Sequence, residues 1–186
     1  MKKYLNSLML LLLIFSMNIT PVYAAAAVPG GYTSPGVDSN ILSSNITEDI
    51  DIVQKTPRGV FFSAADLKII NEDGEIGVVG NAYMSTEIDE LYMTIYLDRW
   101  VDDDHWDQVD YFDFEFYAED YPDGLTNELV AFTLTGYPKG YYYRLRGTYA
   151  AVKDGVIEGF APVTDGILIP ALLSESRQHG AGIFNS

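Results

Sequence analysis

Four aromatic side chains in the middle of the chain have the spacing of a candidate ligand-binding surface. Tyr92, Tyr96 and Trp100 recur at every fourth residue, and Trp106 follows shortly after them. Residues an even number apart in an extended strand share a face, so the first three point the same way. Aromatic rings on one face stack on sugar rings, and nearby carboxylates bond sugar hydroxyls. We therefore take these four residues as candidate carbohydrate contacts; the alternative is that a second layer or the N-terminal segment covers them.

An acidic run follows this surface and suggests a second kind of chemistry. The carboxylates of Asp102, Asp103, Asp104 and Asp107 are close enough in sequence to gather around Ca²⁺, which prefers several oxygen ligands from one loop. The run does not have the spacing of an EF-hand. We expect a solvated hairpin tip here and keep a calcium site as the alternative. No other cofactor is indicated.

The residue types that usually carry catalysis are sparse. Neither histidine, His105 or His179, lies near a Gly-x-Ser-x-Gly nucleophile motif, and the zinc, phosphate-loop and dinucleotide motifs are missing from the sequence. Two carboxylates can hydrolyse glycosides, and Asp113 and Glu115 share one strand face. Acids are so frequent in this chain, however, that such a pair is expected by chance. We predict that the protein is not an enzyme and has no catalytic residue.

The stretch from Gly140 to Val152 is predicted to be a long central strand. An aromatic surface on a neighbouring strand would need such a strand beside it for support. Alternation places three structural residues on a side with the character of core: Tyr141, Tyr143 and Leu145. A tyrosine there can bond its hydroxyl to a nearby backbone group and lock a corner of a sandwich. Arg144 and Arg146 fall on the other side, which we expect to be solvated and positively charged. We expect them to pair with acids on neighbouring strands; the alternative is an anion or ligand site.

Short apolar runs separated by turn signals make up the rest of the domain. No segment keeps a 3.6-residue apolar period over three turns. A break in alternation at Tyr111-Phe112 predicts a bulge, or a sheet covered on both faces. These features predict an all-β fold: an antiparallel Greek-key β-sandwich of the immunoglobulin-like kind with about seven or eight strands, or alternatively a small β-barrel. The expected strands are 59–62, 67–70, 75–84, 91–100, 106–118, 129–135, 140–152, 156–162 and 163–169, with hairpin turns at Asn71–Gly74 and Asp154-Gly155.

The N-terminal residues predict export. Lys2 and Lys3 are followed by an apolar run, and Val22-Tyr23-Ala24 suits signal peptidase, so residues 1–24 read as a secretory signal peptide. We expect a secreted, extracellular protein with no membrane segment after cleavage. The remaining chain divides into a flexible leader or linker at 25–57, the sandwich at 58–170 and a C-terminal tail at 171–186. An edge strand at Ile46–Val53 is an alternative for part of the leader.

The composition limits both partners and means of stabilisation. The net charge is −16, and loss of residues 1–24, which hold two lysines and no acid, would bring it to −18. A field of this sign repels phosphate backbones and anionic lipids, so nucleic acid is excluded as a partner. The chain has no cysteine, so the core must hold the fold without disulfides. A cell-surface glycan or protein remains as the partner, and the oligomeric state stays open.

The core from about Gly74 to Ile169 resembles a family of small, uncharacterised secreted proteins from Gram-positive bacteria. The matching features are the strand from Ile88 to Leu97, Trp106, the segment from Gly140 to Gly147, and Thr164 to Ile167. The resemblance implies an immunoglobulin-like sandwich core and brings no activity or catalytic residue. The chain departs from the pattern at Tyr149, where relatives often carry histidine.

These observations favour a secreted, non-catalytic binding or surface-interaction module whose ligand the sequence does not identify. One alternative is a carbohydrate-binding module that uses the aromatic face. Another is a structural or accessory secreted protein with no small ligand. An enzyme comes last, because the sequence offers no arrangement for catalysis.

Overall fold

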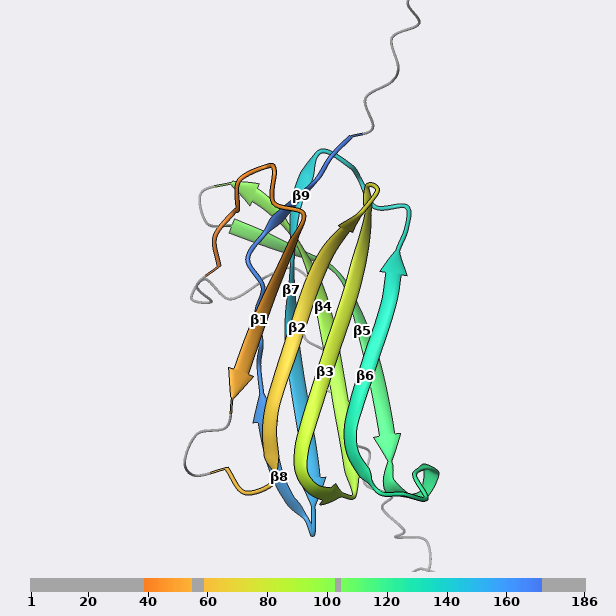
Figure 1. Cartoon of the computed structure of the whole chain (residues 1–186). Helices are drawn as coiled ribbons and strands as arrows, with labels where there is room; N and C mark the ends of the chain where they lie inside the picture. Colours follow the sequence, from red (N-terminus) through yellow and green to blue (C-terminus); the bar gives the residue numbers. More distant parts are fainter. Residues whose placement is uncertain (1–38, 55–58, 103–104, 172–186) are drawn as a thin grey trace, which may run out of the picture. The chain divides into compact units, whose positions relative to one another are not determined.

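Two facing sheets form the part of the chain that the structure describes (Figure 1). The structure is a computed structural model that describes residues 39–54, 59–102 and 105–171, all within the unit Gly31–Ser186. The expected signal peptide, and the expected tail beyond residue 171, lie outside these ranges. The strands are β1 (Glu48–Gln54), β2 (Phe62–Glu72), β3 (Glu75–Ile88), β4 (Glu90–Asp102), β5 (His105–Tyr117), β6 (Leu125–Leu134), β7 (Tyr141–Lys153), β8 (Val156–Phe160) and β9 (Ile167–Ile169), with the short 3₁₀ helix η1 (Ala118–Asp120) between β5 and β6.

The topology is that of an antiparallel β-sandwich. One sheet has the order β1-β2-β3-β6, and the other has the order β5-β4-β7-β8 with β9 also beside β7. Strand β6 lies next to β3, and β7 lies next to β4, which are Greek-key neighbours three places apart in the chain. The sheets do not close into a barrel. The sandwich prediction is therefore confirmed, with nine strands among the described residues rather than seven or eight.

Two hairpin turns lie where the turn chemistry predicted them. Asp73-Gly74 joins β2 to β3 with φ values of 54° and 87°, and Asp154-Gly155 joins β7 to β8 with values of 50° and 74°. These angles lie in the left-handed region, which glycine adopts freely and aspartate tolerates. The two-residue loops set the register of the strands on either side of them.

Alternation along the central strands produces the core. Leu145 and Tyr149 of β7 are buried, and so are the inward side chains of β4: Leu91, Met93, Ile95 and Leu97. The opposite sheet contributes the buried side chains Leu67, Ile69, Ile76 and Val78. Burying one Leu or Ile side chain contributes about 1.5–3 kcal/mol to the stability of the folded state. The paired inner faces therefore stabilise the fold, as expected for a chain that has no disulfide.

The sandwich begins before the boundary expected at residue 58. Strand β1 pairs with β2 along its whole length, so an edge strand occupies part of the expected leader. Two of its carboxylates also reach the loop after β8, because Asp51 accepts a hydrogen bond from the Val163 amide at 2.8 Å and Asp49 accepts one from the Asp165 amide at 2.7 Å. The acidic cluster therefore ties the first sheet to the second.

The irregularity in β5 is a bulge that lies slightly earlier than expected. Val109 is left without a partner in the pairing with β4, two residues before the predicted break at Tyr111. Beyond the bulge the phenylalanines face the other sheet, and the rings of Phe112 and Phe114 lie 5.1 and 5.6 Å from that of Phe132. The bulge thus directs the phenylalanine side chains of β5 toward the other sheet.

One of the two candidate corner tyrosines takes the structural role. Tyr143 is fully buried and its hydroxyl donates to the Pro138 carbonyl at 2.7 Å. Tyr141 is 46% exposed, so the expectation that it lies in the core is wrong. It begins β7 at the end of the sheet, where the Arg99 guanidinium lies 5.1 Å from its ring centre.

We expect substitutions of Tyr143 to separate its hydrogen bond from its packing. Tyr143→Phe removes the bond to Pro138 and should lower the free energy of unfolding by about 0.5–1.5 kcal/mol. Tyr143→Ala also leaves a cavity and should cost about 3–5 kcal/mol. Urea unfolding measures both. In thermal unfolding, a Tyr143→Ala variant whose melting temperature lies within about a degree of that of wild type would show that the ring is not part of the core.

We expect Tyr149 to make stability fall at alkaline pH. Burial, and then the charge of Asp66, raise the pKa of this phenol above its ordinary value of 10.0. The unfolded chain releases this proton near pH 10 while the folded chain retains it, so the free energy of unfolding is unaffected below that pH. Above it, stability should fall by up to about 1.4 kcal/mol per pH unit until the folded-state pKa is passed.

Urea unfolding from about pH 8 to 11 tests this. Tyr149→Phe removes the share of this one phenol, so its alkaline fall in stability should be shallower than that of wild type, and the lower range should stay parallel to wild type. Tyr111→Phe, at a side chain 56% exposed, is the matched control. Equal alkaline slopes for wild type and Tyr149→Phe would refute the assignment.

Candidate ligand-binding site

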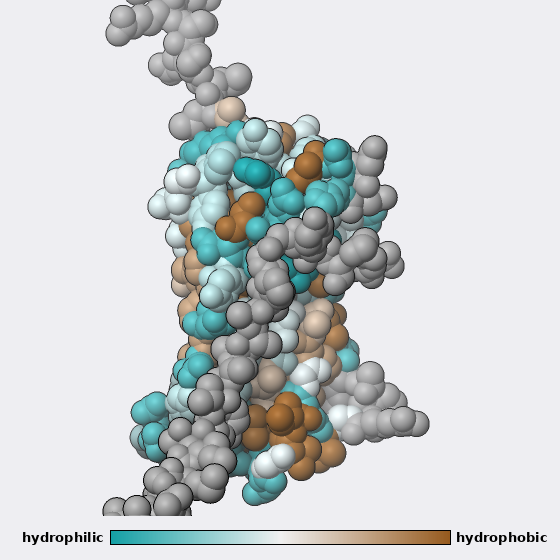
Figure 2. Space-filling model, turned by 180° about the vertical axis from the view of Figure 1, so that it is seen from behind, coloured by the Kyte–Doolittle hydropathy of each residue, from teal (hydrophilic) through white to brown (hydrophobic). Residues whose placement is uncertain are grey.

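The outer face of the second sheet carries a regular array of tyrosines and carboxylates. We call it the tyrosine face: Glu90, Tyr92, Thr94 and Tyr96 of β4, and Tyr111, Asp113, Glu115 and Tyr117 of β5. The register places Tyr92 opposite Glu115, Thr94 opposite Asp113, and Tyr96 opposite Tyr111. This sheet lies behind the first one in Figure 1, so Figure 2 shows its side of the molecule. Two of these cross-strand pairs, Glu90–Tyr117 and Tyr92–Glu115, therefore join a tyrosine to an acid.

Hydrogen bonds within the tyrosine face orient its rings. The Tyr92 hydroxyl donates to Glu90 at 2.5 Å, and the Tyr117 hydroxyl donates to Glu115 at 2.5 Å. The hydrogen bond to Glu90 is the main cause that raises the pKa of Tyr92 above its ordinary value, and the bond to Glu115 acts in the same way on Tyr117. The rings of Tyr92 and Tyr117 meet edge to face at 6.3 Å. Both phenols are thus neutral and held in place before any ligand arrives.

Part of this face was predicted and part was missed. Tyr92 and Tyr96 lie on it as expected from their spacing, and both are partly buried by their neighbours. Tyr111 and Tyr117 were not singled out, although Tyr111 is 56% exposed. The signal for them was the strict alternation of Tyr111, Asp113, Glu115 and Tyr117 with Phe112, Phe114 and Phe116, which begins only after the bulge.

The two tryptophans leave the tyrosine face, which corrects the expectation of one shared aromatic surface. The end of β4 and the start of β5 bend away from the rest of the sheet (Figure 1). Trp106 is only 3% exposed and packs edge to face on Trp100, with ring centres 5.2 Å apart. Trp106 also lies so close to Gly166 that a Cβ there would come within 2.4 Å of the indole. Trp106 is therefore a packing residue, and Trp100 borders a separate pocket.

A buried ionic cluster lies at the same end of the sheet. Asp98 has no exposed surface and Arg144 is 1% exposed. Asp98 accepts hydrogen bonds from Arg144 Nε at 3.0 Å and from Arg146 Nε at 2.6 Å, and Arg146 Nη2 also donates to Gln108 at 3.1 Å. The predicted pairing of the arginines with an acid on a neighbouring strand is confirmed, but the prediction of a solvated face is wrong for Arg144.

Segments distant in the sequence explain why Arg144 is buried on this side of β7. Trp106 stacks on Arg144, with the guanidinium carbon 4.5 Å from the ring centre. Val163 forms a bridge with Arg146, and the residue pair Ile41 and Gly166 forms another beside it. Alternation along β7 gives no hint of this extra layer, because the covering residues come from a bent hairpin and two loops.

The cluster brings together two guanidinium groups and one carboxylate. Arg144 Nη1 is buried and has no hydrogen-bond partner within the described ranges. Burial lowers the pKa of Arg144, and the negative charge of Asp98 opposes that effect. A charge removed from water is costly unless it is paired, so Asp98 is the residue on which the cluster depends.

The candidate metal residues that the structure describes do not form a cluster. Asp102 is exposed at the end of β4, and Asp107 lies on β5 with its carboxylate 3.1 Å from His105 Nε2. Asp103 and Asp104 lie outside the described residues. Among those described, no three His, Asp or Glu side chains lie together as potential metal ligands. The calcium hypothesis for the whole run stays a prediction.

The polar groups considered for catalysis lie apart. His105 is at the bent hairpin end beside Asp107, whereas Asp113 and Glu115 lie on the tyrosine face. Asp113 accepts a hydrogen bond from Thr94 at 2.6 Å, so this carboxylate is part of the ordered surface. His179 lies outside the described residues.

Comparisons with known proteins identified no relative of this chain. A scan against protein-family models, a search of curated proteins and a search of solved structures each gave no match. Within the described ranges, no helix has the length and apolar character needed to cross a bilayer.

We expect Asp98→Asn to lower the free energy of unfolding by about 3–5 kcal/mol, because it leaves two arginines at a buried position without their counter-charge. Asp113→Asn is the matched control on the exposed part of the same sheet and should change stability by no more than about 0.5 kcal/mol. Chemical denaturation compares the two. A cost below about 1 kcal/mol for Asp98→Asn would mean that water reaches the cluster.

Proposed function

We propose that the protein is a secreted, non-catalytic binding module that uses the tyrosine face to contact a ligand outside the cell. The carrying observation is that four tyrosines and three carboxylates share the outer face of one sheet, with Tyr111, Asp113 and Glu115 exposed. The signal-peptide pattern at residues 1–24 supports export. The resemblance to small secreted proteins of Gram-positive bacteria agrees with this setting.

The physical case for binding is the low cost of ordering this surface. Tyrosine offers a large contact area with few rotatable bonds, which is why binding surfaces are rich in it. Two of the four rings are already held by Glu90 and Glu115. Because these side chains lose little freedom on contact, more of the contact energy remains as affinity.

Carbohydrate is the ligand class that the tyrosine face favours. A phenol ring can stack on the apolar side of a sugar, and the adjoining acids Asp113 and Glu115 accept bonds from hydroxyls. One side of the Tyr96 ring already carries the Arg146 guanidinium, 4.7 Å from its centre, so only its other side is available. Tyr92 and Tyr96 are four residues apart on one strand, so their positions differ by about 13 Å. A ligand that engages both must be extended, as a glycan chain is. The acidic field of the protein disfavours nucleic acid and other polyanions.

The remaining alternative is a structural or accessory secreted protein with no small ligand. In that case the tyrosines would only shield the outer side of the sheet. If the tyrosines only shield the sheet, replacing one exposed ring by a polar side chain should leave the function of the protein unchanged. Binding would be lost by the same replacement, so the two functions are separable by experiment.

We expect the protein without residues 1–24 to bind extended neutral glycans on an array, and Tyr111→Ser to weaken that binding at least about tenfold, as for loss of a well-packed aromatic contact. Tyr83→Ser is the matched control, since this tyrosine is 42% exposed on the outer side of the other sheet. An array without neutral-glycan binding would exclude the carbohydrate ligand. Equal binding by wild type and Tyr111→Ser would exclude the tyrosine face.

A further inference from the structure

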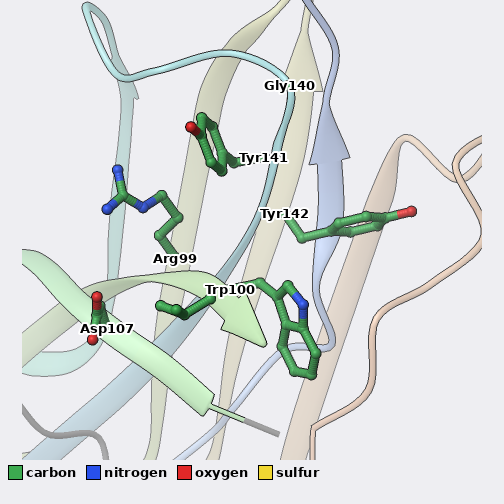
Figure 3. A pocket seen from close by; sticks show the side chains of 7 residues that line it. Arg99, Trp100, Asp107, Gly140, Tyr141 and Tyr142 are labelled. Carbon is green, nitrogen blue, oxygen red and sulfur yellow. The ribbon is translucent and has the colours of Figure 1, made fainter. Parts of the chain in front are cut away.

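A pocket of about 240 Å³ lies at the bent end of the second sheet, apart from the tyrosine face. It is lined by the end of β4, the start of β5 and the start of β7, and Figure 3 shows its labelled residues: Arg99, Trp100, Asp107, Gly140, Tyr141 and Tyr142. Three of the side chains are aromatic and two are charged. Trp100 and Asp107 belong to two different sites expected from the sequence, and the fold brings them to one pocket.

The two charged groups of this pocket do not pair with each other. Arg99 and Asp107 are opposite in the β4–β5 register, yet they form no ion pair. The guanidinium instead lies over the Tyr141 ring, and Asp107 turns to His105. In Figure 3 the side chain of Arg99 lies beside Tyr141 and that of Asp107 lies below them, apart from the guanidinium. The pocket therefore offers separate sets of donors and acceptors.

This situation differs from that of the other two arginines of the sheet. Arg144 and Arg146 are both bound to Asp98, whereas Arg99 has no carboxylate partner within the described ranges. Arg99 is held on one side by Tyr141 and also lies near the Tyr143 hydroxyl. Burial raises the pKa of that phenol, and the positive charge of Arg99 opposes the rise. Its planar donors are thus oriented but not saturated by a counter-charge.

The size and chemistry of the pocket define a narrow class of ligand. A volume of about 240 Å³ is below the range of most drug-sized sites and suits a single ring. Aromatic walls require an apolar side on that ring, and the Arg99 and Asp107 groups require neighbouring hydroxyls that both accept and donate. The opposite charges of Arg99 and Asp107 balance each other, and the field of a chain with net charge −16 disfavours an anion.

We propose that this pocket binds one neutral sugar ring, the terminal unit of a glycan. The proposal rests on the carbohydrate-binding function and adds a second site to it. Arg99 donates to hydroxyl oxygens, Asp107 accepts from a hydroxyl, and Trp100 or Tyr142 packs on the ring. The tyrosine face would bind the chain of the glycan, and the pocket would recognise its end.

The experiment uses intrinsic fluorescence of the protein without residues 1–24, which has only two tryptophans. Trp100 lines the pocket and Trp106 packs against it, so both report on this site. The probes are methyl glycosides of neutral hexoses and N-acetylhexosamines, with methyl glucuronide as the anionic comparison. We expect a saturable change with at least one neutral glycoside. Its dissociation constant should rise at least about tenfold in Arg99→Met and in Asp107→Asn, as for loss of a charge-assisted hydrogen bond.

Tyr111→Ser is the control that separates this site from the tyrosine face, and it should leave the fluorescence titration unchanged. Should Arg99→Met fail to fold, Asp107→Asn alone decides. No saturable change with any neutral glycoside, or a response to the glucuronide only, would overturn the pocket proposal. Glycan-array binding that depends on Tyr111 would then still stand, so failure of the pocket and failure of the proposed function are distinguishable.

Discussion

The neutralisation of two arginines by one buried carboxylate constrains the second sheet. Asp98 follows the β4–β5 bulge and bonds Arg144 and Arg146 of β7. A shift of register by one residue would turn Asp98 to the other side of β4 and leave both guanidiniums unpaired. The same register places Tyr96 opposite Tyr111 and beside Arg146. The order of the tyrosine face therefore depends on the buried cluster.

Carboxylates in this acidic chain also hold the two sheets together. Asp49 and Asp51 accept hydrogen bonds from amides of the loop after β8. Glu158 of β8 accepts from the amides of Val60, Phe61 and Phe62, at and just before the start of β2. Hydrogen bonds from amides to ionised acceptors are stronger than those between neutral groups. In a chain without cysteine, these bonds supply links between layers that a disulfide often supplies elsewhere. The excess of acid is thus partly structural.

The proposed binding surfaces share one scaffold but differ in shape. The tyrosine face follows the regular part of β4 and β5, where alternation keeps the rings on one side. The pocket forms beyond the bulge, where the strands bend and side chains from both phases of the strands meet. A flat array suits an extended chain, whereas a small concavity suits its end.

The sequence by itself determined the features that depend on near neighbours. Alternation placed Tyr143 and Leu145 inside, and Asp-Gly pairs marked the hairpins, because strand pleat and turn angles follow from local sterics. Only the tertiary structure decided that Arg144 is dry, that Trp106 is a packing residue and that β1 completes the first sheet. Those outcomes depend on which distant segment covers a face of the sheet. Residues 39–42 contact residues 161–166, for example, although the two segments are more than a hundred positions apart in the sequence. Local periodicity carries no information about that contact, since burial of an outer face depends on the whole fold.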